Sequence, residues 1–234
     1  MTLIVTGLTV SDGNRMAVQN VDLTISPGKV TAVIGANGAG KSELVLALAG
    51  VLPIISGQVF LDDAPLHGKG PEAIRRAGVA AIPEGHRVLT DLSVDDNLRA
   101  AGSLIKGGLE ARLADTYAVF PELAERKPQL AGTLSGGQQQ MVALAHALMC
   151  QPRYLLIDEM SLGLAPLIVK RLLGVVTDLK AKGVGILLIE QFTDLALGIA
   201  ETAVVLRGGK MRYNGPAADL ANDTQRLHEA YFGV

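Results

Sequence analysis

The sequence Gly35-Ala-Asn-Gly-Ala-Gly40-Lys41-Ser42 is the strongest local indication of the fold, because it joins an apolar predicted strand, residues 30–34, to a predicted helix that begins at Gly40. A glycine-rich loop between a strand and a helix is the setting that phosphate binding requires. Backbone N–H groups of such a loop curl around phosphate oxygens, and the start of the helix adds a partial positive charge. The alternative is an ordinary glycine-rich turn, which the placement between strand and helix disfavours.

This loop therefore predicts a nucleotide site. Lys41 is expected to reach the β- and γ-phosphates and to act in catalysis, and the Ser42 hydroxyl is expected to bind Mg²⁺. We predict nucleotide binding by the whole loop, which comprises Gly35, Ala36, Asn37, Gly38, Ala39, Gly40, Lys41 and Ser42.

Two acids follow a second apolar stretch, the predicted strand at residues 154–157. Ligands of α/β proteins bind at the carboxyl ends of parallel strands, which is where Asp158 and Glu159 stand. Asp158 is expected to hold Mg²⁺, directly or through water, and Glu159 to polarise the attacking water. Taken alone, acids at a strand end are often only solvated loop residues. Together with a phosphate-binding loop, they favour a catalytic function.

A further anion-binding helix start is predicted at Leu134-Ser135-Gly136-Gly137-Gln138. A hydroxyl and two glycines begin this helix, and helix starts of that kind attract phosphate. The loop at residues 35–42 already satisfies its phosphate with its own backbone, so Ser135, Gly136, Gly137 and Gln138 are expected to contact the nucleotide of another subunit. The sequence therefore predicts a dimer.

The rest of the chain predicts an α/β fold with a mostly parallel core sheet. Short strands open the sequence at residues 3–10 and 19–25, a mainly helical insertion covers about 90–135, and strands then alternate with helices. Within the insertion, Ser93 and Asp96 are placed like a helix cap and its return contact, and Pro121 opens another helix. With 234 residues, the chain is expected to form a single domain, residues 1–234.

Composition limits the choice of partners and location. The formal net charge of -2 gives no electrostatic case for nucleic acid or an anionic membrane surface. The single cysteine, Cys150, predicts a small buried side chain in a reducing, cytosolic protein without a targeting segment. The histidines share no ligand spacing and are expected to be surface or partner-facing residues rather than metal ligands; they are His67, His86, His146 and His228.

In their order and spacing, residues 35–42, 134–138 and 154–159 resemble the Walker A, signature and Walker B motifs of ABC ATPases. Pro83-Glu84-Gly85-His86-Arg87-Val88, the turn at residues 161–166 and Ile189-Glu190-Gln191 look like the shorter ATPase subunit of branched-chain amino acid importers. The resemblance implies a P-loop NTPase fold with an N-terminal antiparallel part, and a head-to-tail homo- or heterodimer that holds two ATP molecules. It also implies that membrane permease subunits are partners and that a periplasmic or extracellular substrate-binding protein is an indirect partner. The expected location is peripheral, on the cytoplasmic face of the cell membrane.

Four positions depart from the usual ABC pattern. Glu84 stands where most members have glutamine, and it is expected to contact the nucleotide and the metal. Its carboxylate can accept a hydrogen bond from a metal-bound water, but it cannot donate one as an amide does. Gln191 stands in place of the switch histidine, so it can hydrogen-bond a γ-phosphate but cannot become cationic. Met160 replaces a proline and is expected to loosen the turn that holds Glu159. No aromatic residue precedes Phe60, so Val18 or Met16 is expected to pack against the base, with weaker adenine discrimination. The alternative is that each of these two side chains is simply part of the core.

Several functions stay open at this point. Importer ATPases for urea, short amides or other small solutes are similar to those for branched-chain amino acids. A soluble ABC protein is a further alternative, although the chain has no room for the long coiled coils or duplicated domains that many of these carry. A mainly regulatory subunit with weak turnover is a third, motivated by Gln191 and Met160.

Overall fold

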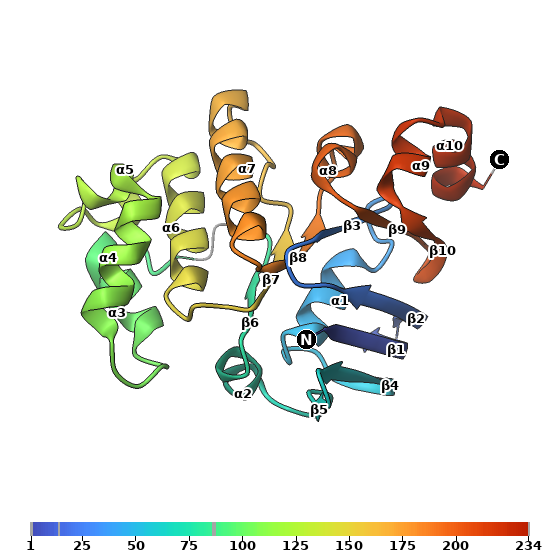
Figure 1. Ribbon diagram of the computed structural model, residues 1–234, viewed down its shortest axis with the longest axis horizontal. Coiled ribbons are helices and arrows are strands. Elements are labelled where there is room, and N and C mark those ends of the chain that lie inside the picture. Colours follow the sequence, from blue (N-terminus) through green and yellow to red (C-terminus); the bar gives the residue numbers. More distant parts are fainter. Residues whose placement is uncertain (1, 14, 86–87, 234) are drawn as a thin grey trace.

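The computed structural model describes residues 2–13, 15–85 and 88–233, and it contains a six-stranded sheet in the order β10-β9-β3-β8-β7-β6 (Figure 1). Neighbouring strands are parallel except β9 and β10, so the predicted mostly parallel core is confirmed. The strands are β3 (Val30–Ile34), β6 (Val79–Ile82), β7 (Tyr154–Asp158), β8 (Gly185–Ile189), β9 (Thr202–Arg207) and β10 (Lys210–Pro216).

A four-stranded antiparallel sheet with the order β2-β1-β4-β5 forms the N-terminal part. Its strands are β1 (Leu3–Asp12), β2 (Arg15–Ile25), β4 (Ile54–Leu61) and β5 (Ala64–Pro65). Helix α1 (Lys41–Leu48) lies between the two sheets and buries Leu44, Val45 and Leu48 in one apolar cluster with side chains of both. Burial of this helix on two sides fixes the loop that precedes it.

Helices cover the remaining faces of the core sheet (Figure 1). They are α2 (Pro71–Arg76), α6 (Gly136–Leu148), α7 (Pro166–Ala181), α8 (Thr193–Ile199), α9 (Ala217–Ala221) and α10 (Thr224–Phe232). Gly208 and Gly209, for which the sequence predicted no element, form the tight turn between β9 and β10 with φ angles of 57° and 76°. Two consecutive positive φ angles match the twist of a hairpin, and glycine adopts them without steric cost.

The helical insertion contains α3 (Val94–Gly102), α4 (Leu109–Val119), α5 (Pro121–Ala124) and a short 3₁₀ turn (Ala131–Thr133). Ser93 Oγ accepts from Asp96 N at 3.0 Å, as the cap predicts, but the Asp96 carboxylate returns its contact to the Ser93 hydroxyl instead of the backbone. Leu98 and Leu113 of the insertion share an apolar cluster with Leu155 of the core sheet. This continuous core supports the prediction of a single domain.

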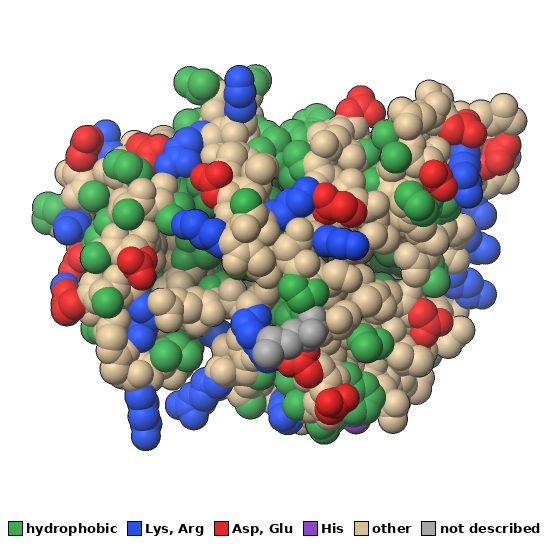
Figure 2. Space-filling view, in the orientation of Figure 1, with side chains coloured by type: hydrophobic (Ala, Val, Ile, Leu, Met, Phe, Trp, Pro, Cys, Tyr) green, Lys and Arg blue, Asp and Glu red, His purple; other side chains and the backbone are tan. Residues whose placement is uncertain are grey.

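The distribution of charged side chains and the burial of Cys150 can be compared with the predictions made from composition. Basic and acidic side chains are interspersed over the face in view in Figure 2. Cys150 is buried, as expected. In the described parts of the chain, no helix has the length and apolar character needed to span a membrane, and no three His, Cys, Asp or Glu side chains gather in a way that could hold a metal.

The histidines differ from one another. His146 is not the surface residue that the sequence predicts, because it is largely buried on α6, where its carbonyl oxygen accepts from Arg75 Nη2 at 3.0 Å. Burial first, and the Arg75 charge second, lower the pKa of His146 to about 4. The His67 ring packs edge-on against Phe60 and is half-buried, whereas His228 is exposed. His86 and its neighbour Arg87 lie outside the described residues.

We predict that His146 makes stability depend on acid. Between pH 6.5 and about 4, the unfolded chain binds a proton at this position that the folded chain does not. The free energy of unfolding should therefore fall by up to about 3 kcal/mol as the pH drops through that window. Urea unfolding at several pH values measures this, and His146→Gln should flatten the profile. His228→Gln is the control that should not, and equal slopes for parent and His146→Gln would contradict the prediction.

Candidate functional site

The loop between β3 and α1 has a backbone that only glycine fits at two positions. Gly35 and Gly40 have φ angles of 152° and 101°. A Cβ atom on Gly35 would lie 2.2 Å from the Leu206 carbonyl oxygen, and one on Gly40 would lie 2.2 Å from that of Ala17. Backbone from both sheets therefore presses against this loop, which holds it in a defined shape at the carboxyl end of β3.

Lys41 begins α1 and is 5% exposed. Its Nζ donates to the carbonyl oxygens of Gly35, at 2.8 Å, and Ala36, at 3.2 Å. The Glu159 carboxylate lies 4.0 Å from the same ammonium group. The Lys41 ammonium group therefore lies over the loop. A bound phosphate would replace the two carbonyl oxygens as its hydrogen-bond acceptor.

Asp158 lies at the end of β7 and is 2% exposed. Burial raises its pKa to about 6, a hydrogen bond from Ser42 acts in the opposite direction, and the charges of Glu159 and Glu84 raise it further. Its Oδ1 atom has no hydrogen-bond partner among the described residues. A buried carboxylate oxygen without a partner, beside a hydroxyl and a second carboxylate, is an all-oxygen donor set of the kind Mg²⁺ prefers. These residues fit the predicted metal.

A cavity of about 370 Å³ brings together four separate segments of the chain. It is lined by Asn37, Gly38, Gly40, Lys41, Ser42, Glu43, Glu84, Glu159, Leu162 and Gln191. The structure thus places the predicted Glu84, Glu159 and Gln191 around the predicted phosphate loop, although they come from the ends of three different core strands. Asp158 lies beneath this lining. The arrangement can hold a triphosphate, place an acid beside it and present an amide from the opposite side.

The signature residues are not part of that cavity. Ser135 and Gln138 form a reciprocal cap at the start of α6: Ser135 Oγ accepts from Gln138 N at 3.4 Å, and Gln138 Oε1 accepts from Ser135 N at 3.0 Å. Ser135 and Gly136 are exposed, and Gly137 packs on Ile168. One chain therefore carries an exposed helix start that its own phosphate loop does not use.

Val18 does not take the role that the sequence analysis gave it. It is fully buried in the apolar cluster beneath the loop, where its Cγ2 would lie 3.3 Å from a Cβ atom on Gly40. A side chain with no exposed surface cannot pack against a base, so the prediction for Val18 is wrong. Met16 is 45% exposed. Arg15, which the sequence analysis missed, donates from Nη2 to the Gly38 carbonyl oxygen at 2.5 Å.

Two further buried polar residues adjoin the site without lining it. Glu190 is 1% exposed and Ser161 is 2% exposed, and the Ser161 hydroxyl donates to Glu190 Oε2. Both stood in quoted motifs, but neither received a role. In the sequence, the indication for a role of these two residues is that they stand close to Glu159 and Gln191. Their burial and their contact with each other depend on the folded chain and cannot be predicted from either position.

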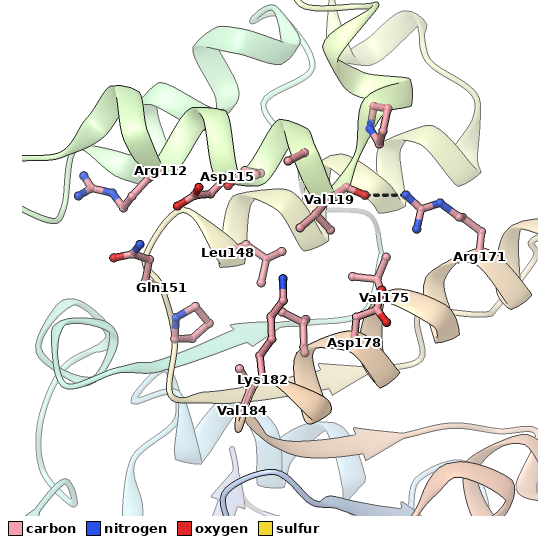
Figure 3. Close-up of a pocket in the computed structure, with 15 residues that line it drawn as sticks. Arg112, Asp115, Val119, Leu148, Gln151, Arg171, Val175, Asp178, Lys182 and Val184 are labelled. Carbon is pink, nitrogen blue, oxygen red and sulfur yellow. Dashed lines mark hydrogen bonds between the residues drawn. The ribbon is translucent and has the colours of Figure 1, made fainter.

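A larger cavity, about 790 Å³, lies apart from these motifs, between α4 and α5 of the insertion and α7 (Figure 3). Leu148, Val119 and Val175 provide apolar walls, and Lys182 and Asp178 stand on the α7 side. None of the predicted site residues lines it. Size alone therefore does not select the functional site of this protein.

Comparison with known proteins decides the family. The model of the ABC transporter family matches residues 18–161, which is more than half of the chain. The chain belongs to the ABC transporter family. It is therefore an ATP-binding and ATP-hydrolysing subunit, and the predicted ABC ATPase fold is confirmed.

Curated relatives of this ABC ATPase include branched-chain amino acid transport proteins. The high-affinity branched-chain amino acid transport ATP-binding protein BraG of Pseudomonas aeruginosa is 37% identical over 222 residues, 94% of this chain and 95% of BraG. The probable branched-chain amino acid transport ATP-binding protein LivF of Archaeoglobus fulgidus is 37% identical over 86% of each chain. The lipopolysaccharide export ATP-binding protein LptB of Escherichia coli is 28% identical over 99% of this chain and 97% of LptB.

Solved structures agree with the family. A nucleotide-free ATP-binding cassette from an ABC transporter superposes with a TM-score of 0.86 at 25% identity, covering 100% of both chains. An ATP-binding cassette in its ADP conformation, MJ1267, gives a TM-score of 0.83 at 26% identity, again over 100% of both chains.

We predict that this ABC ATPase discriminates weakly between bases. Val18 is buried and Arg15 is bonded to Gly38, whereas Met16 is 45% exposed and offers apolar surface but no aromatic ring for stacking. ATP and GTP should then compete with a fluorescent nucleotide at affinities within about threefold, less than 1 kcal/mol apart. Inorganic tripolyphosphate, which has no base, is the control. A preference for ATP above about tenfold would contradict the prediction.

Proposed function

We propose that this ABC ATPase powers an importer for branched-chain amino acids. The observation that carries the proposal is the likeness to two branched-chain amino acid transport proteins at 37% identity over most of the chain. The cavity that joins the phosphate loop to Glu84, Glu159 and Gln191 supports its enzymatic part. Related importers for urea, amides or other small solutes are the alternative substrate classes, which the same architecture would serve.

In the proposed mechanism, the residues of the loop bind the triphosphate through their N–H groups. Lys41 exchanges the carbonyl oxygens of Gly35 and Ala36 for β- and γ-phosphate oxygens. Ser42, Asp158 and Glu84 hold Mg²⁺, which when bound neutralises charge that develops on the phosphates. The buried position of Asp158 favours this role, because a charged carboxylate there gains more from a cation than an exposed one does.

Glu159 then polarises the attacking water and Gln191 hydrogen-bonds the γ-phosphate. Glu159 lies 4.0 Å from Lys41, so its charge is kept close to the reacting end of the triphosphate. The amide of Gln191 orients the phosphate but carries no charge, and it therefore stabilises less developing charge than a cationic side chain would. The neutral amide of Gln191 therefore lowers the rate of turnover. The catalytic carboxylate of Glu159 is still present, which argues against a purely regulatory subunit.

The working unit in this proposal is a head-to-tail homo- or heterodimer. The start of α6 comprises Ser135, Gly136, Gly137 and Gln138, of which Ser135 and Gly136 are exposed, and it closes over the nucleotide held by the second subunit. Two ATP molecules lie between the subunits. The segment around residues 84–104 transmits closure to membrane permeases from the cytoplasmic face, and a substrate-binding protein outside the membrane takes part indirectly.

A lipopolysaccharide export function is the second candidate. The likeness to the export protein LptB extends over 99% of this chain but stands at 28% identity, below the 37% of the two amino acid transport proteins. Sequence identity of the ATPase does not report the cargo directly, because cargo is selected by other subunits. The transport experiment below therefore decides between the candidates.

The catalytic part is tested with Glu159→Gln. Removal of the carboxylate should lower the rate of ATP hydrolysis more than about a hundredfold, since general-base catalysis contributes factors of that size. Affinity for ATP with magnesium should stay within about threefold, because the loop is unchanged. Glu72→Gln, at an exposed ion pair with Arg76 on α2, is the control with parent activity. Equal hydrolysis by Glu159→Gln and the parent would show that Glu159 is not catalytic.

The substrate is tested by expressing the ATPase with the permease and binding-protein genes encoded beside it. Cells should take up labelled leucine, and unlabelled isoleucine and valine should compete, while urea and acetamide should not. Replacing the parent ATPase with Glu159→Gln should abolish uptake. Uptake of urea or an amide in place of leucine would assign the alternative substrate class, and a requirement for the ATPase in lipopolysaccharide export would favour the second candidate.

A further inference from the structure

A buried carboxyl group links two motifs of the site from behind. Glu190 follows β8 directly, and Ser161 lies in the turn after β7. The Ser161 hydroxyl donates to Glu190 Oε2, and the Ser161 backbone N–H donates to the same carboxylate. Both residues are at least 98% buried and neither lines the nucleotide cavity. Glu190 is therefore placed to act on the shape of the site and not on the nucleotide.

This contact is one of two that fasten the turn to β8. β7 and β8 are parallel neighbours in which Asp158 pairs with Ile189. One residue later, Glu159 N donates to the Ile189 carbonyl oxygen at 3.0 Å. The turn that carries Glu159 is thus held at its first residue by a backbone bond and at Ser161 by the Glu190 side chain. Gln191 follows Glu190 immediately, so the same contact also fixes the start of the segment that carries Gln191.

The backbone of Glu159 needs such support. Its φ angle is 49°, in the left-handed region that residues other than glycine rarely adopt. Conformations of this kind cost of order 1–3 kcal/mol and persist only where the surrounding structure holds them. Met160 is 2% exposed and packs in the apolar core, so its side chain also anchors the turn.

Burial of the Glu190 carboxyl group has a desolvation cost that a purely structural position would avoid. Its Oε1 atom has no partner among the described residues, and the neighbouring acids Glu159 and Asp158 oppose its charge. Burial, the largest cause, raises the pKa of Glu190 to about 7. A well-packed apolar side chain would avoid this desolvation cost. Stability alone therefore gives no reason for a carboxyl group here, whereas the two donors of Ser161 do.

We propose that Glu190 is a positioning residue for ATP hydrolysis, which aims the Glu159 carboxylate and Gln191 at the nucleotide by clamping Ser161 against the end of β8. The inference rests on the proposed catalytic role of Glu159. Without the clamp, the turn relaxes toward ordinary backbone angles and Glu159 moves off the line of attack. The phosphate loop, which is held by other contacts, keeps its affinity for ATP.

The test compares Glu190→Met with Glu190→Gln. Methionine has similar size but accepts no strong hydrogen bond, so kcat should fall at least about tenfold while KM and the Kd for ATP with magnesium stay within about twofold. Glutamine keeps an oxygen that accepts both Ser161 donors, and it should restore kcat to within about threefold of the parent. This split and this rescue distinguish positioning from a general loss of folding, which circular dichroism and urea unfolding monitor separately.

Ser161→Ala provides the second arm and remains informative should Glu190→Met not fold. It removes one donor and should lower kcat with unchanged KM. In the double variant Ser161→Ala/Glu190→Met, kcat should be no lower than in Glu190→Met alone, because both changes break one contact. Thr116→Val is the matched control: it removes a buried hydroxyl of α4, which is bonded to Met149 at the end of α6, and it should leave kcat unchanged.

Parent kcat in Glu190→Met, or additive losses in the double variant, would overturn the inference. So would a loss of ATP affinity parallel to the loss of kcat. Glu159→Gln separates this failure from that of the proposed function. If Glu159→Gln is inactive while Glu190→Met is normal, only the clamp is refuted, whereas normal hydrolysis by Glu159→Gln refutes the catalytic role itself.

Discussion

Two backbone carbonyl groups approach the phosphate loop closely and set its shape, and with it the arrangement of the site. Ala17 belongs to the antiparallel sheet and Leu206 to the core sheet, and each leaves no room for a side chain on the glycine that faces it. The loop is therefore shaped by both sheets at once. Helix α1 packs between the two sheets, and its first residue, Lys41, is thereby held at the site.

Acids outnumber cations among the described residues of the site. Lys41 lies beside Glu159, while Asp158 is held behind the cavity with a raised pKa and an unpaired oxygen. Such an arrangement is costly in the isolated chain, because buried carboxylates without cations are poorly solvated. The same cost becomes useful when a nucleotide and its metal bring compensating charge. The site is thus incomplete in charge as well as in shape until it is loaded.

The departures from the common ABC pattern acquire a physical meaning in three dimensions. A residue before proline is steered away from helical backbone angles, whereas Met160 places no such restriction on Glu159, whose φ angle is 49°. The methionine side chain also fills the core. Hydrogen bonds to Ile189 and Glu190 hold the same turn. The loosening expected where Met160 replaces a proline stays a prediction.

Elements that are encoded locally could be predicted from the sequence. The phosphate loop, the parallel strands, the capped start of α6 and the helices of the insertion follow from glycine placement, periodicity and capping, all within short stretches of chain. Four features came from the folded chain alone: Val18 is fully buried, His146 is largely buried, Glu84 and Gln191 face one cavity, and the Ser161 hydroxyl donates to Glu190. These depend on which distant strands become neighbours and in what register. A one-residue shift in that register would reverse the face of every side chain, and no local pattern records it.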